Sequence, residues 1–368
     1  MWGCNMNPIR ILNSNLQVNG EIDNYESLQF IRRWQKPGEF ELHININKAH
    51  TDKLIEDNLI MLGNGQKIGV IRHAENTLDD KGNASDELLV KGTTLQGLIG
   101  RRITVPPAGQ GYDRASGPAE AIIKQYVYNN CVYPADPKRV IQALTVASYK
   151  GIGKLTVWQT RFEPLDAVLQ DISEFCDMGW DITLDIPNFL MVFEVLEGRE
   201  LTAGQSLLPP VIFSTDFENV KSQHYVNSAL NYKNVGYAGG QGDEEARLIQ
   251  VIGDASGLSR IETFLDCSQA ADADELVSLG EQKLAELKKV QTFEMGISPT
   301  NQFIYEKDWD LGDKVTLQSK KWGITMDSRI TEVKEIYEAS GFSLEATFGN
   351  NIPTLIDKLK KNTKRTVR

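Results

Sequence analysis

The segment Trp309-Asp310-Leu311-Gly312-Asp313-Lys314-Val315-Thr316-Leu317, near the end of the 368-residue chain, is the most informative about the fold. Its centre predicts a tight turn, because Gly312 takes a positive φ at little cost and the side chain of Asp313 can hydrogen-bond its own backbone. The turn launches a predicted strand over residues 314–318. A turn that starts a strand is common in all-β proteins.

Two more strands are predicted after this turn, at residues 329–337 and 342–348. The second alternates apolar and polar side chains, as a strand with one buried face requires. Its apolar positions are Phe342, Leu344, Ala346 and Phe348. Together the three strands predict a β-meander that closes a small barrel.

The start of the chain predicts a β-barrel domain of its own, residues 1–105. Its short apolar runs and alternating segments are typical of strands, and they include residues 40–46, 59–62, 67–72 and 87–91. The connecting turns are expected at residues 63–65 and 79–83. A Pro- and Gly-rich segment at 106–111 breaks the pattern and places a domain boundary there.

Residues 106–205 change to a helical period and predict a peripheral α+β domain. Pro118 opens one helix, whose apolar side contains Ile122, Ile123, Tyr126 and Val127. A capping box of Thr160 and Glu163 is expected to start a second helix, which Gly179 ends. A hairpin follows, with strands at 180–184 and 189–195.

Residues 206–350 predict a second β-barrel domain. Its strands are expected near 222–232, 234–238, 247–252, 260–265 and 292–297, before the meander. A helical insertion near 268–290 interrupts them, with an apolar stripe formed by Ala273, Leu276, Gly280, Leu284 and Leu287. The predicted fold class is therefore mainly β with α+β insertions, followed by a basic C-terminal helix or tail at 351–368.

Composition narrows the function classes. Four separated cysteines, Cys4, Cys131, Cys176 and Cys267, form no Cys-x-x-Cys pair, which argues against a zinc ribbon or a disulfide framework. No secretion signal and no apolar run long enough for a membrane span occur, so we expect a soluble protein made in a cytoplasm. The net charge of −11 disfavours a sequence-reading DNA binder.

The sequences of several segments resemble those of the hub proteins of long-tailed bacteriophages, the siphovirus tail-hub family. This family is related in fold to the baseplate hubs of contractile tails. The likeness recurs in order along nearly the whole chain. The segments that carry it are residues 21–28, 37–42, 90–95, 101–103, 234–240, 256–262, 309–317 and 348–350.

The resemblance implies a structural protein without covalent chemistry at the distal tip of a phage or prophage tail. It implies a homotrimer whose six barrels dock on a six-fold tube, with the middle domain outside that tube. The implied partners are the distal tail protein, the tape-measure protein and receptor-binding proteins, after assembly in the bacterial host cytoplasm. DNA would pass without specific binding during genome ejection, through a channel that we hypothesise to have acidic walls.

The residue types that catalysis and metal binding require do not form recognisable motifs in this chain. The histidines His43, His50, His73 and His224 form no His-Glu-x-x-His motif, and the Gly-Lys at 153–154 lacks the spacing of a phosphate loop. The turn at 237–242 joins two predicted strands, so a dinucleotide site is not expected there. The sequence therefore predicts no catalytic residue, no metal ligand and no cofactor.

Two alternative functions stay open. A cell-wall hydrolase would use paired carboxylates such as Glu194 with Glu197, or Asp308 with Asp310. A carbohydrate- or receptor-binding module would use exposed aromatic platforms, for which Trp158, Trp180 and Trp322 are the candidates. The basic end, residues 358–368, is expected to be a solvated tail or a tether to an acidic neighbour.

Overall fold

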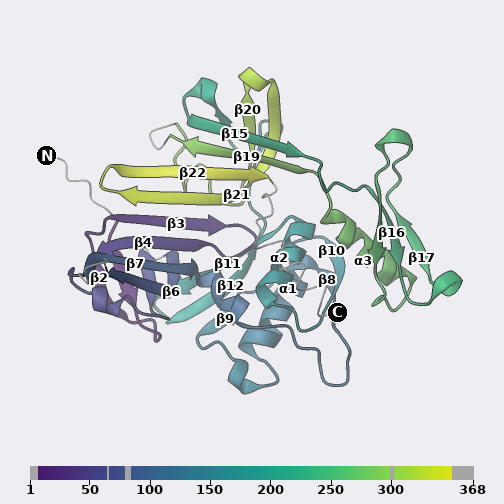
Figure 1. Cartoon of the computed structure of the whole chain (residues 1–368), viewed down its shortest axis with the longest axis horizontal. Helices are drawn as coiled ribbons and strands as arrows, with labels where there is room; N and C mark the ends of the chain where they lie inside the picture. The colour runs from purple at the N-terminus through teal and green to yellow at the C-terminus, as the bar shows by residue number, and fades with distance from the viewer. Residues whose placement is uncertain (1–6, 64–65, 79–83, 299–301, 350–368) are drawn as a thin grey trace.

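The computed structural model describes residues 7–63, 66–78, 84–298 and 302–349 (Figure 1). Its first β region has seven strands: β1 (Ile9–Leu12), β2 (Val18–Ile22), β3 (Ser27–Arg33), β4 (Glu39–Asn45), β5 (Leu59–Leu62), β6 (Lys67–Leu78) and β7 (Ala84–Thr94). In β4 the buried residues Phe40, Leu42 and Ile44 alternate with more exposed ones, as the sequence predicts. The predicted turn at 79–83 and part of that at 63–65 lie outside the described residues.

The middle region mixes helices and short sheets. Its elements are β8 (Asp113–Pro118), α1 (Ala119–Val127), β9 (Leu144–Val146), β10 (Leu155–Thr160), α2 (Leu165–Cys176), β11 (Gly179–Asp185) and β12 (Leu190–Leu196). Both predicted helices and the predicted hairpin, β11 with β12, are present. The predicted apolar side of α1 is buried, with its four residues at most 1% exposed.

The expected start and end of α2 are wrong in detail. Thr160 lies in β10, and its Oγ1 is 2.8 Å from Oγ1 of Thr104, so it does not cap the helix. The backbone N–H of Glu163 donates to the same Thr104 oxygen. The helix ends at Cys176 because Asp177 takes the left-handed conformation at φ 57°, two residues before Gly179. A tertiary hydrogen bond therefore replaces the local capping box.

The last β region contains β13 (Glu200–Leu201), β14 (Ile212–Ser214), β15 (Val220–Ser228), β19 (Val290–Ile297), β20 (Lys314–Ser319), β21 (Ile324–Glu338) and β22 (Gly341–Gly349). The predicted meander corresponds to β20, β21 and β22, which pair antiparallel in this order. Gly312 has φ 90°, as the predicted turn requires. Shorter helical turns are η1 (Thr51–Lys53), η2 (Leu95–Arg101), η3 (Tyr128–Val132), η4 (Pro137–Arg139), η5 (Thr215–Phe217), η6 (Glu244–Ala246), η7 (Gly257–Ser259) and η8 (Lys320–Trp322).

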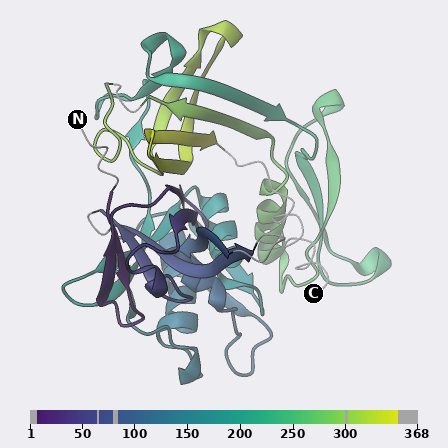
Figure 2. The same ribbon diagram turned by 60° about the vertical axis from the view of Figure 1, so that its left-hand side comes forward.

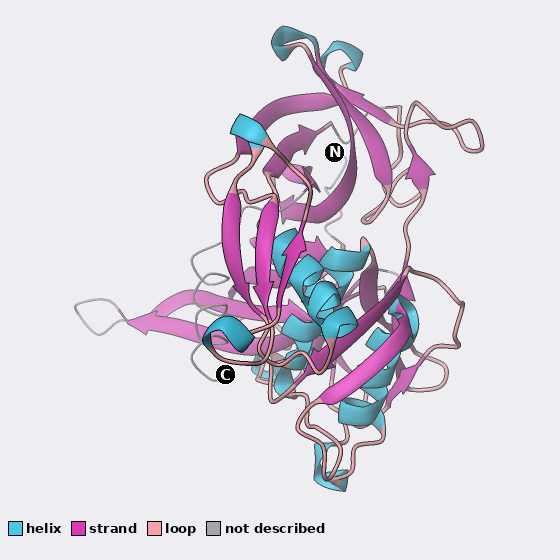
Figure 3. Ribbon diagram, turned by 90° about the vertical axis from the view of Figure 1, so that its right-hand side faces the viewer, coloured by secondary structure: helices cyan, strands magenta, loops and turns pink. Residues whose placement is uncertain are grey.

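Three strands that we expected in the second barrel form a separate sheet instead. They are β16 (Val235–Gly239), β17 (Ile249–Ile252) and β18 (Glu262–Asp266), paired in the order β17-β16-β18. Helix α3 (Ala273–Ala285) covers one face of this sheet, and Figure 3 shows the module facing the viewer. The buried residues of the two elements make a core of their own, which includes Ala238, Ile252, Leu265 and Leu276. The insertion is therefore larger than the helix that the sequence suggested.

The first and last β regions share one sheet, because β3 pairs with β21. The strand order is β15-β19-β22-β21-β3-β4-β7-β6-β5-β1-β2, and most of these strands lie one above another in Figure 1. Figure 2 shows the last region above the first, with the module of α3 to one side. The fold is mainly β, as predicted. Among the described strands no pairing joins the two ends of this order, so barrel closure stays a prediction.

The middle region packs directly on the first sheet. Strand β5 is buried on both faces: Ile60 and Leu62 belong to the core inside the first region, whereas Leu59 and Met61 join the core around α1 and α2. A strand buried on both faces is apolar throughout, which explains the run Leu59–Leu62. The core therefore crosses the boundary expected near residue 105, and the division into domains stays a prediction.

Candidate functional site: a charged cleft between three regions

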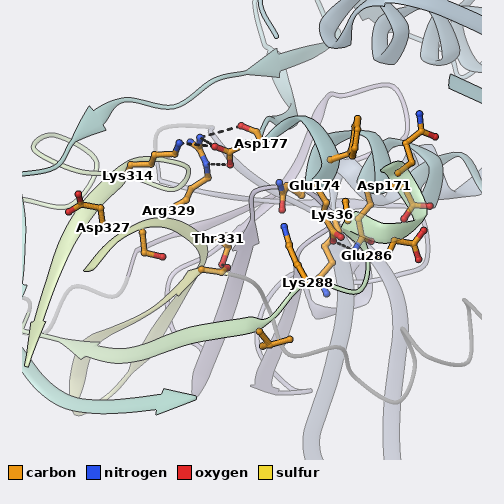
Figure 4. Close-up of a pocket in the computed structure, with 18 of the residues that line it drawn as sticks. Lys36, Asp171, Glu174, Asp177, Glu286, Lys288, Lys314, Asp327, Arg329 and Thr331 are labelled. Atoms are coloured by element: carbon orange, nitrogen blue, oxygen red, sulfur yellow. Dashed lines mark hydrogen bonds and ion pairs between the residues drawn. The ribbon is translucent and has the colours of Figure 1, made fainter. Parts of the chain in front are cut away.

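A cleft of about 710 Å³ lies between the middle region, the α3 module and the last β region. Figure 4 shows the charged side chains that face it, with α2 and α3 on one side and β20 and β21 on the other. The lining residues are mostly polar: Gln35, Lys36, Trp158, Gln170, Asp171, Glu174, Phe175, Asp177, Glu200, Gln282, Ala285, Glu286, Lys288, Val290, Lys314, Asp327, Ser328, Arg329, Thr331 and Gly349. Hereafter "the cleft" means this set.

The apolar part of the cleft is a pair of aromatic rings. Trp158 of β10 and Phe175 of α2 have ring centroids 6.1 Å apart, and both side chains are half-buried. The Nζ atom of Lys154 lies 3.5 Å from the centroid of Phe175, a cation–π contact. The Nε2 group of Gln282 on α3 donates a 2.7 Å hydrogen bond to the carbonyl of Val157, which holds α3 beside this pair.

An ion cluster at the other end of the cleft joins the middle region to the last one. Arg329 of β21 donates two 2.8 Å hydrogen bonds to the carboxylate of Asp177, and Lys314 lies 2.8 Å from the same group. Burial favours the neutral form of Asp177, but the bonds from Arg329 and Lys314 outweigh it and hold its pKa below the usual value. The left-handed backbone of Asp177 aims this carboxylate at the last β region.

Behind the cluster lies Trp34, which follows β3 and is 4% exposed. The Arg329 guanidinium lies over its indole at 5.6 Å, and Gly179 and Gly312 both press on the ring so closely that a Cβ on either would clash. Trp34, at the end of the first β region, therefore touches both the middle region and the last β region. No local pattern around Trp34 predicts this role, because its contacts join residues far apart in the chain.

The stretch around Gly312 is held by a second ion pair. Asp313 is 3% exposed; its carboxylate pairs with Arg199 at 2.6 Å and also accepts the backbone N–H groups of Arg199 and Asp310. The bond from Asp310 confirms the predicted local hydrogen bond of the turn. The partnership with Arg199 was not foreseen, because 114 residues separate the two side chains.

A further polar cluster lies where β21 meets the first β region. Glu335 is fully buried and accepts from Nζ of Lys67 and from the hydroxyl of Tyr305, both at 2.7 Å, and from Tyr337. Burial raises the pKa of both tyrosines, so their hydroxyls stay protonated and donate. Arg32 completes the cluster with a 2.8 Å bond to Asp310.

Of the four histidines, His50, His73 and His224 are exposed and His43 is half-buried. His43 lies between Glu41 and Glu87, at 2.9 and 2.5 Å, and these bonds raise its pKa. His73 contacts Glu75 and His224 contacts Glu294, each at 3.1 Å. Each of these three contacts acidic side chains, an arrangement that supplies no nucleophile.

The candidate carboxylates have structural partners, and the three candidate tryptophans lie in different places. Glu194 is paired with Lys150, Asp310 with Arg32, and Asp308 accepts the backbone N–H of Ile304. Trp180 is 1% exposed and is no binding platform. Trp322 is half exposed, stacked on Phe293, and Trp158 alone of the three lines the cleft.

The described part of the chain contains no group of three or more His, Cys, Asp or Glu side chains placed to hold a metal ion. Within the same ranges, no helix is long and apolar enough to cross a membrane. Cys131 and Cys267 are buried and Cys176 is half-buried, whereas Cys4 lies outside the described residues.

Solved structures with a similar fold are phage and prophage tail proteins. The tail protein from Neisseria meningitidis MC58 matches with a TM-score of 0.58 at 14% identity, over 93% of this chain and 96% of that one. The 43 kDa tail protein of prophage MuSo2 from Shewanella oneidensis matches with a TM-score of 0.59 at 13% identity, over 93% and 98%. Prophage tail protein gp18 from Listeria monocytogenes EGD-e matches with 0.54 at 11%, over 97% and 98%.

These likenesses establish the fold, and a family model establishes the relationship. No curated protein matches the chain. The model of the Siphovirus ReqiPepy6 Gp37-like protein matches residues 8–350, which includes all the segments that carry the expected resemblance. That resemblance to a siphovirus tail protein family is confirmed, and the chain belongs to the Siphovirus ReqiPepy6 Gp37-like protein family.

Proposed function

We propose that the protein is a structural hub at the distal tip of a phage or prophage tail, where it links the tail tube and the distal tail protein to the tip. The observation that carries this proposal is the family match over residues 8–350. The fold shared with three tail proteins over at least 93% of this chain supports it.

The pairing of β3 with β21 joins the first and last β regions. Seven residue pairs join the two strands, and Arg33 binds Glu332 of β21 and Glu39 of β4 at 2.6 Å each. Because the two β regions are parts of one sheet, each copy presents them at a fixed spacing. Three copies would then offer six β regions to a six-fold tube.

The same assembly forms part of the DNA channel. The net charge of −11 disfavours lasting contacts with phosphates, so DNA would pass without being held. The tape-measure protein and receptor-binding proteins are the other proposed neighbours in the virion. No covalent step is part of this function.

The test is the mass of the purified protein by light scattering, alone and mixed with the distal tail protein encoded beside it. We expect a trimer, or a monomer that becomes a trimer on mixing. A protein that stays monomeric and does not bind the distal tail protein would overturn the hub proposal. Hydrolysis of purified peptidoglycan, or binding to bacterial glycans, would instead support the hydrolase or carbohydrate-binding alternative.

A further inference from the structure

The cleft lies where the described chain ends. Gly349, the last described residue, is part of its lining, and residues 350–368 follow it directly. This C-terminal segment therefore starts at the cleft and needs no linker to reach its walls. A segment tethered at its binding site has an effective concentration in the millimolar range, which favours binding within one molecule over binding between molecules.

The charge of the C-terminal segment is opposite to that of the rest of the chain. Its basic residues are Lys358, Lys360, Lys361, Lys364, Arg365 and Arg368, and its one acidic residue is Asp357, so it carries +5. Since the whole chain carries −11, residues 1–349 carry −16. Electrostatic attraction therefore favours contact of the C-terminal segment with an acidic part of its own molecule.

The apolar residues of the segment recur at helical spacing. Ile352, Leu355, Ile356 and Leu359 occupy positions i, i+3, i+4 and i+7, which a helix brings to one face. Asn351 is a favoured residue type for a helix N-cap, and Pro353 is tolerated in a first turn. The sequence thus predicts a short helix with an apolar face and a basic face.

The cleft offers a matching surface. The wall formed by α2 and the end of α3 carries Asp171, Glu174 and Glu286, which Figure 4 shows on the side opposite Arg329. Lys36 and Lys288 lie on the same side, so this wall has three acidic and two basic side chains. The half-buried rings of Trp158 and Phe175 lie in the same lining. We propose that residues 350–368 bind in the cleft of their own molecule, with the apolar face on these rings and basic side chains toward that wall.

This inference concerns a single chain and goes beyond the hub function. The test places the photo-crosslinker p-benzoylphenylalanine at Leu359 of the full-length protein, irradiates at high dilution, and maps the products by mass spectrometry. We expect crosslinks within one molecule to α2, α3 or β10. The crosslinker at Ser340, in the exposed turn between β21 and β22, is the control position and should not reach the cleft.

Charge reversal in the cleft distinguishes electrostatic docking of residues 350–368 from crosslinking by chance proximity. Asp171→Lys with Glu286→Lys should lower the crosslinking yield from Leu359 roughly fourfold, because the loss of each of two exposed ion pairs contributes about a twofold factor. The matched control is Asp243→Lys with Asp254→Lys, which makes the same change of charge at exposed positions outside the cleft. Circular dichroism and the midpoint of thermal unfolding verify that both variants fold.

Three results would overturn the proposal. Crosslinks found only in covalent dimers or trimers would identify a second copy as the occupant of the cleft. Crosslinks scattered over the exposed surface, with no enrichment at α2 and α3, would show that the segment has no docking site. An equal yield from both charge-reversed variants would remove the electrostatic basis. None of these results depends on trimer formation with the distal tail protein, so the two proposals fail separately.

Discussion

The turn at Gly312 lies directly on the indole of Trp34: a Cβ atom on Gly312 would be 2.2 Å from Cζ3 of the ring. Real Cβ atoms do not approach other atoms so closely, so this position has room for glycine only. Gly312 also has φ 90°, a conformation that side chains disfavour. Two independent constraints, the positive φ and the contact with Trp34, therefore require glycine at position 312.

We expect Gly312→Ala to lower the free energy of unfolding by about 3 kcal/mol, because backbone strain and overpacking add. Urea unfolding followed by tryptophan fluorescence measures the change. Gly323→Ala is the matched control, since Gly323 has φ 64° but nothing within 4 Å of a Cβ. It should cost only about 1 kcal/mol of strain. Equal losses in the two variants would show that Trp34 yields to the added methyl group.

The sequence predicted the first of these constraints and not the second. The positive φ of Gly312 follows from a local turn, and local patterns also gave the meander, α1, α2 and the β11–β12 hairpin. The contact between Gly312 and Trp34 joins residues that are separated by most of the chain, so the local periodicity of apolar residues cannot predict it. The capping box failed for the same reason: Thr104, distant in sequence, takes the hydrogen-bonding role that local spacing assigned to Thr160.

The cleft was equally hidden from sequence analysis. Asp177, Lys314 and Arg329 come from a helix end and two strands, and each looks like an ordinary surface residue in its own segment. Of the residues chosen for possible function, only Trp158 lies in the cleft. The pairing of β3 with β21 joins the start of the chain to its end. The alternation of residues within each strand does not reveal which strands pair.

Asp177→Asn should destabilise the protein by about 2 kcal/mol at pH 7, because Arg329 is 9% exposed and loses its anion, while the half-exposed Asp177 limits the loss. The pKa of Asp177 is lowered in the folded state, so its contribution is complete above the unfolded pKa near 4 and disappears as the pH falls through the folded value. Urea unfolding at several pH values should show the two proteins converging in acid.

Glu262→Gln is the control for this prediction. Glu262 pairs with Arg260 at 2.5 Å on the surface, where solvent screens the pair. This variant should unfold at the same urea concentration as the wild type at pH 7. A loss as large as that of Asp177→Asn would mean that exposed and buried ion pairs contribute alike, contrary to our explanation of the cleft.

Asp181→Asn is expected to stabilise the protein at neutral pH. Burial raises the pKa of Asp181 to about 6, so the folded state holds its proton more tightly than the unfolded state does. Stability is therefore lost as the pH rises from about 4 through 6, and an amide removes this loss. We expect a gain of about 2 kcal/mol at pH 7 and no gain at pH 4, measured by urea unfolding. A variant less stable than wild type at pH 7 would show that attraction to Arg32 dominates.

Lys67→Met should be among the most destabilising single changes in the chain. It removes the cation 2.7 Å from the fully buried Glu335 and leaves a carboxylate with only tyrosine donors, a loss of about 3 kcal/mol or more. Because Lys67 belongs to β6 and Glu335 to β21, the variant weakens the contact between the first and last β regions. Urea unfolding provides the free energy of each variant.

The double variant Lys67→Met with Glu335→Leu tests whether the cost of Lys67→Met comes from leaving a buried carboxylate without its cation. If the cost of Lys67→Met comes from stranding a buried charge, the added Glu335→Leu should recover part of it, giving a coupling energy of about 1 kcal/mol or more. The exposed pair of Lys91 with Glu41, 2.7 Å apart, provides the comparison cycle and should show no measurable coupling. Additive losses at Lys67 and Glu335 would mean that this cluster acts through packing, and that charge does not join the two β regions.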